Sequence, residues 1–141
     1  MKISIPTRLI SFLTIVLLLI NFSFALLIVW PADVIDLKKL ELIGNGKIYA
    51  GDVVWYRLTY DKKKDLPCSV SKQLVNKIII TFPAEFSNMP IGSRDMIQSI
   101  QIPKSIEPGL HKLRGSLTYR INFLREKTYT IETSPFMVYE R

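Results

Sequence analysis

Residues 9–30 form a run of 22 residues without a charged side chain, and this run restricts the possible folds more than any other feature. As an α-helix the run would be roughly 33 Å long at about 1.5 Å per residue, enough to cross the apolar core of a bilayer. Lys2 and Arg8 precede it without an acidic residue, so the positive-inside rule keeps the N-terminus in the cytoplasm. We therefore predict a cytoplasmic tail over residues 1–8, a single-pass transmembrane helix (an uncleaved signal anchor) over residues 9–30, and an exported domain over residues 31–141.

A cleaved secretory signal is the competing interpretation of the same run. The first eight residues would be its basic segment, and Ser23 and Ala25 supply the small-x-small pattern of a cleavage site. The apolar run continues to Trp30, however, so cleavage would leave a strongly apolar N-terminus on the mature protein. The sequence favours the anchor. Both interpretations export residues 31–141, in a bacterium to the periplasmic side of the inner membrane.

The exported segment has the pattern of one all-β domain. Its 111 residues contain short alternating or β-branched runs between turn signals, and no window in it has helical periodicity. In the run 53–60, alternation places Trp55 and Arg57 on the face opposite to Tyr56 and Leu58. We predict a single antiparallel β-sandwich of seven or eight strands, with residues 61–67 and 84–95 as polar loops. The predicted strands are residues 34–43 with a continuation over 47–49, then 53–60, one or two strands within 68–82, 97–102, 110–123, 127–133 and 136–139.

Two motifs in this segment resemble those of bacterial and viral immunoglobulin-like domains. Tyr49, Gly51, Asp52 and Val54 are similar to the start of the second strand of such domains. A second set is similar to their Pro-Gly turn and final strands: Ile106, Pro108, Gly109, His111, Leu113, Leu117, Tyr119, Ile121, Pro135, Phe136 and Val138. An N-terminal apolar helix followed by one such domain also resembles small membrane proteins of tailed bacteriophages. The resemblance implies an immunoglobulin-like sandwich, a fold that hosts unrelated functions and therefore implies no activity.

Composition limits the chemistry available to the domain. The chain has one Cys and one His, which excludes zinc knuckles, iron–sulfur centres and disulfides within the chain. Any triad would need His111, which stands where the resemblance has a Tyr and is better interpreted as a structural residue bonded to nearby backbone. The acidic residues are scattered over turns without metal-binding spacing. We expect no catalytic residue, no cofactor and no metal, and hence no enzyme.

Five residues are candidates for a binding surface. Trp55 beside Arg57 has the character of a protein- or sugar-binding anchor, although packing in the core is the alternative for the indole. Lys112, Arg114 and Arg120 share the outer face of one long strand, where they would meet anionic headgroups or form an ordinary solvated face. Lys62, Lys63 and Lys64 are likewise interpreted as a solvated loop. Export argues against nucleic acid as a partner.

Cys68 is the remaining candidate. In an oxidising compartment an exposed, unpaired thiol would link two chains by an intermolecular disulfide. A buried and inert thiol is the alternative, because a reactive thiol needs partial exposure and a nearby cation.

These features together predict a membrane-anchored, non-enzymatic protein. Its immunoglobulin-like domain would bind another protein of the cell envelope or of a virion, and the chain would be phage-encoded. The alternative is a secreted soluble domain, freed by cleavage of the signal, that binds a glycan or inhibits an enzyme.

Overall fold

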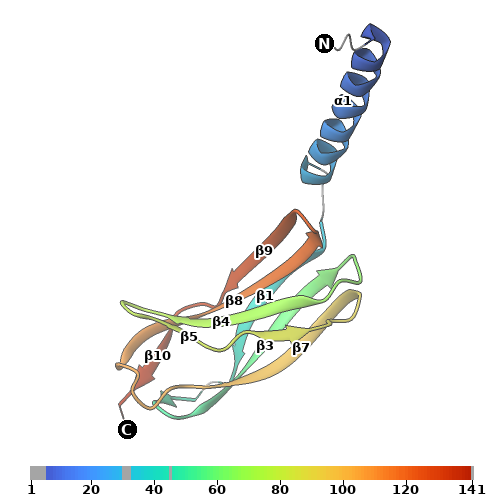
Figure 1. The fold of residues 1–141 in the computed structure, drawn as a ribbon. Helices are drawn as coiled ribbons and strands as arrows, with labels where there is room; N and C mark the ends of the chain where they lie inside the picture. Colours follow the sequence, from blue (N-terminus) through green and yellow to red (C-terminus); the bar gives the residue numbers. More distant parts are fainter. Residues whose placement is uncertain (1–5, 30–32, 45, 141) are drawn as a thin grey trace.

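A computed structural model describes residues 6–29, 33–44 and 46–140. The chain forms one N-terminal helix followed by a β-rich domain, and the helix extends away from the domain (Figure 1). The helix is α1 (Thr7–Val29), and the strands are β1 (Ile35–Ile43), β2 (Ile48–Tyr49), β3 (Val53–Lys62), β4 (Cys68–Val75), β5 (Ile79–Thr81), β6 (Glu85–Ser87), β7 (Gly92–Gln101), β8 (Gly109–Asn122), β9 (Arg125–Glu132) and β10 (Phe136–Tyr139).

The strands form two sheets. The smaller sheet has the order β1-β3-β7, and the larger has the order β2-β10-β8-β4-β5, with β6 paired to β4 and β9 paired to β8. Each sheet turns one face inward, so that every second residue of β3 is buried and the buried residues of β8 (111, 113, 117 and 119) all lie on one face, as the two-residue period of a strand requires. Strands β1 and β9 approach each other at one edge, where the Val34 amide donates to the Tyr129 hydroxyl at 3.1 Å.

The core lies between the two sheets and combines aliphatic residues with buried tyrosines. Tyr60 of β3 and Tyr119 of β8 are almost completely buried, and Leu74, Leu113 and Val138 belong to the same cluster. A turn at Gly51 leads into β3. Its φ of +88° is a conformation that residues with a Cβ rarely adopt, and the Asp52 carboxylate closes the turn by accepting from the Tyr49 amide at 2.9 Å.

The sequence interpretation differs from the structure in three respects. The domain has ten strands among the described residues rather than seven or eight, and β2 pairs with β10 in parallel, so the larger sheet is mixed rather than purely antiparallel. The predicted polar loop over residues 84–95 contains β6 and the first half of β7. The polar residues Ser93 and Asp95 are exposed on β7 while the backbone pairs with β3, so polarity there marks a solvated face and not a loop.

The third difference concerns Lys62, which sequence analysis placed in a solvated loop. It is the last residue of β3, on the inward face that Tyr60 also occupies, and its side chain is 1% exposed. The ammonium donates to the Met89 carbonyl at 2.6 Å and to the Asn88 side-chain oxygen at 3.3 Å, and it lies 5.9 Å from the centre of the Tyr119 ring. Lys62 therefore connects β3 to the loop before β7.

Candidate binding surfaces

Trp55 lies on the outer face of the three-stranded sheet, within a group of exposed apolar side chains. The indole is 52% exposed, which confirms the face assigned from alternation. Ile43 of β1 stands directly opposite Trp55 across the strands, and Ser99 of β7 stands opposite on the other side. Val53 and Ile97 on the same outer face are 56% and 53% exposed. We call Ile43, Val53, Trp55 and Ile97 the Trp55 surface.

Charged side chains border the Trp55 surface, and two cations there share one carboxylate. Arg57 forms an ion pair with Glu41 at 3.7 Å, and Lys39 pairs with the same carboxylate. All three side chains are substantially exposed, so solvent screens these pairs and they contribute little to stability. An apolar centre with a polar, charged border is the arrangement found at protein–protein interfaces.

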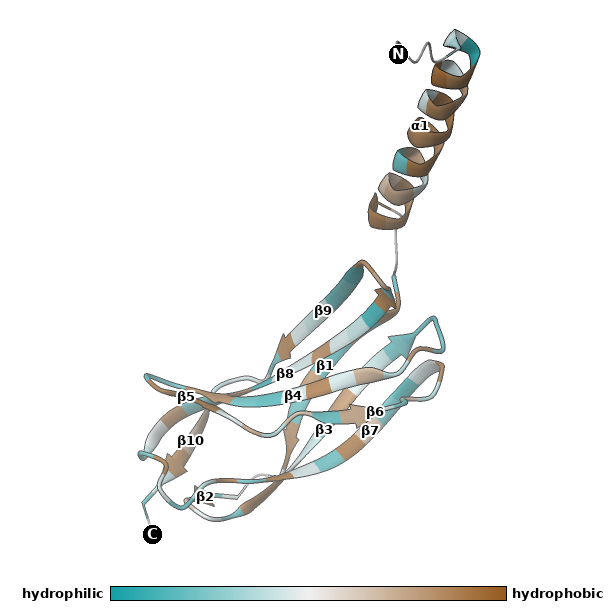
Figure 2. Cartoon of the chain, in the orientation of Figure 1, coloured by the Kyte–Doolittle hydropathy of each residue, from teal (hydrophilic) through white to brown (hydrophobic). Residues whose placement is uncertain are grey.

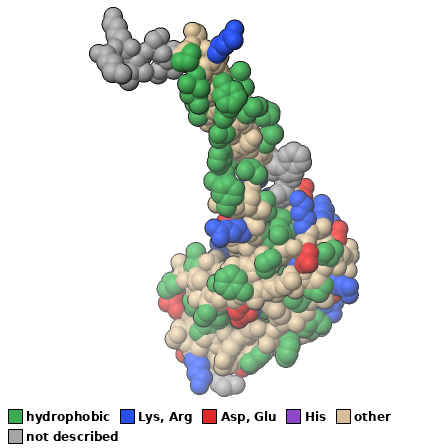
Figure 3. Space-filling model, turned by 45° about the vertical axis from the view of Figure 1, so that its right-hand side comes forward, with side chains coloured by type: hydrophobic (Ala, Val, Ile, Leu, Met, Phe, Trp, Pro, Cys, Tyr) green, Lys and Arg blue, Asp and Glu red, His purple; other side chains and the backbone are tan. Residues whose placement is uncertain are grey.

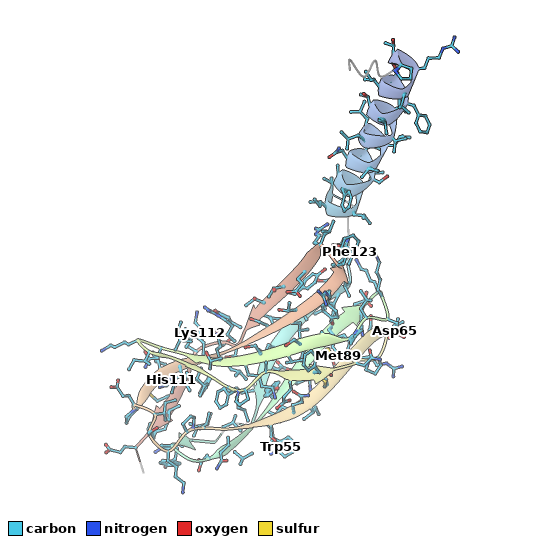
Figure 4. The ribbon with its side chains drawn as sticks, in the orientation of Figure 1. Trp55, Asp65, Met89, His111, Lys112 and Phe123 are labelled. Atoms are coloured by element: carbon cyan, nitrogen blue, oxygen red, sulfur yellow. The ribbon has the colours of Figure 1, made fainter. Side chains whose placement is uncertain are left out.

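The three basic candidates of β8 lie in the other sheet and do not join the Trp55 surface. Figure 4 shows Trp55 and Lys112 on different sides of the domain. Arg114 binds the Glu132 carboxylate at 2.7 Å, and Lys112 approaches the same carboxylate at 3.5 Å. Arg120 stands opposite Glu126 in the β8–β9 register. The hydrogen bond from Arg114, followed by the charges of Arg114 and Lys112, lowers the pKa of Glu132. This face therefore alternates cations with carboxylates.

Cys68 is buried at the start of β4, with 1% of its side chain exposed. Its thiol donates to the Ser87 carbonyl at 3.5 Å. Burial raises the pKa of the thiol, although Tyr119 and the charge of Lys62 act in the opposite direction. A disulfide to a second chain would need a sulfur that solvent can reach, so these strands would have to separate before Cys68 could link two chains.

His111 is also buried, with 4% exposure, at the start of β8. Its Nε2–H donates to the Glu107 carbonyl at 2.8 Å, because a carbonyl can only accept. This is the local backbone bond expected for a structural histidine in place of a Tyr. Within the described residues, no group of three or more His, Cys, Asp or Glu side chains is arranged to hold a metal ion.

An open groove of about 820 Å³ lies where β1 diverges from β9 and β10, and it includes none of the residues predicted as a site. Lys39, Glu41, Glu132, Phe136 and Tyr139 are among the residues that line it. Sequence analysis missed this groove because its two sides come from residues 38–48 and 131–139, which are far apart in the chain. Of the charged residues in the lining, Lys39, Glu41 and Glu132 belong to the ion pairs above, Lys38 pairs with Asp36, and the Lys47 ammonium lies over the Tyr139 ring.

The helix α1 is the second candidate surface, because it is apolar on all sides. None of its residues is buried against the domain. Figure 2 colours most of the helix as hydrophobic, and Figure 3 shows apolar side chains along it. Among the described residues it is the one helix long and apolar enough to cross a membrane. A signal sequence near the N-terminus has the same properties. No protein-family model matches this chain, and no curated protein matches it either.

Proposed function

We propose that this chain is a single-pass membrane protein that binds another protein of the cell envelope through the Trp55 surface. The N-terminus lies in the cytoplasm and the β domain lies on the outer side of the inner membrane. The domain has no catalytic role and is an immunoglobulin-like sandwich. The observation that carries the proposal is the exposed apolar centre around Trp55 on a domain attached to an apolar helix.

The anchor is supported by the exposure of α1. Nearly all large aliphatic and aromatic side chains of the helix are exposed; Phe12, for example, is 62% exposed and Leu18 is 64% exposed. Leaving so many apolar side chains in water is unfavourable by about 25 cal/mol per Å² of exposed area. A bilayer removes that cost, and the basic residue Arg8 before the run sets the orientation.

The immunoglobulin-like assignment is supported by where the resembling motifs fall. Gly51 and Asp52 form the turn that leads into β3, and the long strand β8 begins at Gly109, directly after Pro108. These two strands belong to different sheets and both contribute to the core. This is the packing of a two-sheet sandwich.

The neighbours of Trp55 favour a protein partner over a glycan. Sugar rings are bound by an aromatic face together with several convergent hydrogen-bonding groups. Three outward neighbours of Trp55 are aliphatic, namely Ile43, Val53 and Ile97. Ser99 contributes one hydroxyl, and the charged neighbour Arg57 is engaged with Glu41. Aromatic residues surrounded by apolar contacts are typical centres of protein interfaces.

The anchor is tested first, on a C-terminally tagged copy produced in bacteria. We expect the intact mass of the full chain in the membrane fraction and digestion of the domain when protease is added to spheroplasts. A product shortened by about 25 residues and found in the soluble periplasmic fraction would show a cleaved signal and refute the anchor.

The binding surface is tested by site-specific photocrosslinking in cells. A photoreactive phenylalanine analogue replaces Ile97 on the Trp55 surface or, as the matched control, Ile79 on β5 of the other sheet, because these residues are 53% and 54% exposed. We expect one discrete crosslinked protein from position 97 that is absent from position 79 and is lost when Trp55→Ala is added. Equal crosslinking from both positions, or crosslinking that does not depend on Trp55, would refute this surface.

A further inference from the structure

The turn between β8 and β9 is bonded to the end of α1 that is nearest the domain (Figure 1). The Asn122 side-chain amide donates to the Leu27 carbonyl at 2.9 Å, and the Arg125 guanidinium donates to the Ile28 carbonyl at 2.9 Å. Because α1 ends at Val29, these carbonyls belong to the last turn, which has no partners within the helix. The β8–β9 turn therefore supplies donors that the helix lacks.

The tip of this turn consists of two exposed apolar residues. Phe123 is 67% exposed and Leu124 is 44% exposed. The Phe123 ring lies edge-to-face against Phe24 of α1, with 6.3 Å between the ring centres, and Figure 4 shows Phe123 at the helix end of the domain. An exposed Phe next to an exposed Leu is unusual at the tip of a turn in water, where polar and small residues prevail.

The position of Phe24 in α1 gives the depth of this contact. The helix has 23 residues and is about 35 Å long, whereas the apolar core of a bilayer is about 30 Å thick. Phe24 lies five residues before Val29, or about 7.5 Å from the helix end. With α1 centred in the membrane, Phe24 is about 5 Å inside the apolar core, and the Phe123 ring in contact with it reaches the boundary between acyl chains and headgroups.

Basic side chains surround the same end of the domain. We call Lys63, Lys64, Arg120, Arg125 and Lys127 the basic collar. Lys127 binds the Asp33 carboxylate at 3.2 Å, and the Lys63 amide donates to the Val34 carbonyl at 2.7 Å. Arg125 is bonded to the last turn of α1, so these residues lie at the helix end of the domain. Figure 3 shows Lys and Arg side chains beside the base of the helix. Carboxylates also lie at this end of the domain. Asp36 lines the same hollow as Asp33 and Lys63, Asp61 stands opposite Asp36 in the β1–β3 register, and Glu126 stands opposite Arg120.

We propose that the β8–β9 turn is a membrane-contact element, in which Phe123 and Leu124 insert into the outer leaflet beside α1 and the basic collar lies at the level of the lipid phosphates. Apolar side chains inserted into the boundary region, with cations directly above them, are the usual composition of interfacial protein segments. The inference rests on the proposed anchoring of α1. It adds a second contact between this chain and the bilayer, next to the one that α1 makes.

The test uses the full-length protein, purified from membranes and reconstituted into vesicles of phosphatidylcholine and phosphatidylglycerol. Both native tryptophans are replaced (Trp30→Phe, Trp55→Phe), and a single reporter is introduced as Phe123→Trp. The matched control is Leu110→Trp, because Leu110 is an exposed apolar residue (58%) at the opposite end of the same strand β8. Half of the phosphatidylcholine carries bromine atoms on its acyl chains, which quench nearby tryptophan emission. Flotation of the same samples reports anchoring.

We expect both proteins to float with the vesicles, the reporter at position 123 to lose more than half of its emission in brominated lipid, and the reporter at position 110 to keep its emission. If the proteins float and neither reporter is quenched, α1 anchors the chain but the turn does not touch lipid. The membrane-contact inference is then wrong, and the proposed anchor still holds. Equal quenching at both positions would also overturn it, because the whole domain would then lie on the bilayer. Failure to float would refute the anchor and the inference together.

Discussion

Trp55 and Tyr56 are adjacent on β3 and point to opposite sides of the sheet, which makes them a matched pair for separating binding from stability. The Trp55 side chain is 52% exposed, whereas Tyr56 is 5% exposed and donates its hydroxyl to the Gln98 side-chain oxygen at 2.6 Å. Replacing each by Ala removes a large aromatic side chain from the same strand. The consequences for the folded state differ because only one of the two vacated spaces can fill with water.

The structure gives the expected size of each effect. Tyr56→Ala leaves a cavity in the core and an unpaired Gln98 oxygen, so we expect a loss of about 3–5 kcal/mol in the free energy of unfolding. Trp55→Ala loses only half-buried contacts, about 1–2 kcal/mol at roughly 25 cal/mol per Å², without forming a cavity. At about 4 °C per kcal/mol for a domain of this size, Tm should fall by roughly 12–20 °C for Tyr56→Ala and roughly 4–8 °C for Trp55→Ala.

Binding should follow the opposite order. Truncating a central aromatic residue of an interface typically costs at least about 2 kcal/mol, or roughly 30-fold in Kd at 25 °C. The assay combines thermal unfolding by circular dichroism with titration of the partner recovered by crosslinking, and Phe86→Ala, at a 90% exposed position on β6, is the control that should change neither quantity. A fall in Tm for Trp55→Ala as large as for Tyr56→Ala, or unchanged affinity, would refute the reasoning.

Three further predictions follow from buried polar groups. The Cys68 thiol should react with a thiol reagent much more slowly in the folded protein than in denaturant, and non-reducing gels should show a monomer; rapid labelling of the folded chain would contradict its burial. Burial, with a smaller contribution from the charge of Glu85, raises the pKa of Tyr56 from about 10 to about 12, so the folded state holds this proton more tightly than the unfolded state. The stability that comes from holding this proton is complete below about pH 10 and is lost as the pH rises from about 10 to about 12. The midpoint of urea unfolding should therefore fall across that range, and a midpoint that stays constant would contradict the raised pKa. Lys62→Met leaves the Met89 carbonyl without its donor and should cost about 1–3 kcal/mol, whereas Lys62→Ala adds a cavity and should cost more. If urea unfolding shows that both variants are as stable as the parent chain, the ammonium of Lys62 is not needed in the core.

Alternation in the sequence predicted the parts of the fold that follow a strict two-residue period. The inward residues of β3 and the outward position of Trp55 were predicted in this way, because burial on one face leaves a direct mark on the residue types. The same two-residue period, continued from Tyr60 to Lys62, points Lys62 inward. The charge of Lys62 suggested a loop instead, and its partners in the loop before β7 are set by tertiary contacts that local sequence does not encode.

Other features depend on which strands meet, and this information is not local. The parallel pairing of β2 with β10 joins residues 48–49 to residues 138–139 through a ladder of only two residue pairs, too short to leave a pattern. Pairing of β8 with β9 brings Glu132 to Arg114 and converts an apparently cationic strand face into a mixed one. The approach of Phe123 to Phe24 likewise arises from packing between residues about a hundred positions apart, and sequence analysis placed Phe123 in the strand predicted over residues 110–123 rather than in a turn.

The direction of β3 determines where in the cell a partner would have to be. Its last residue, Lys62, pairs with Ile35 at the start of β1, near α1, and Trp55 lies seven residues earlier, about 23 Å farther from the helix at about 3.3 Å per residue. With α1 in the bilayer and the β8–β9 turn bonded to its end, the Trp55 surface moves laterally at a nearly constant height above the lipid. The domain then meets its partner by diffusion in the plane of the membrane, and only a partner with a complementary apolar surface at that height can bind.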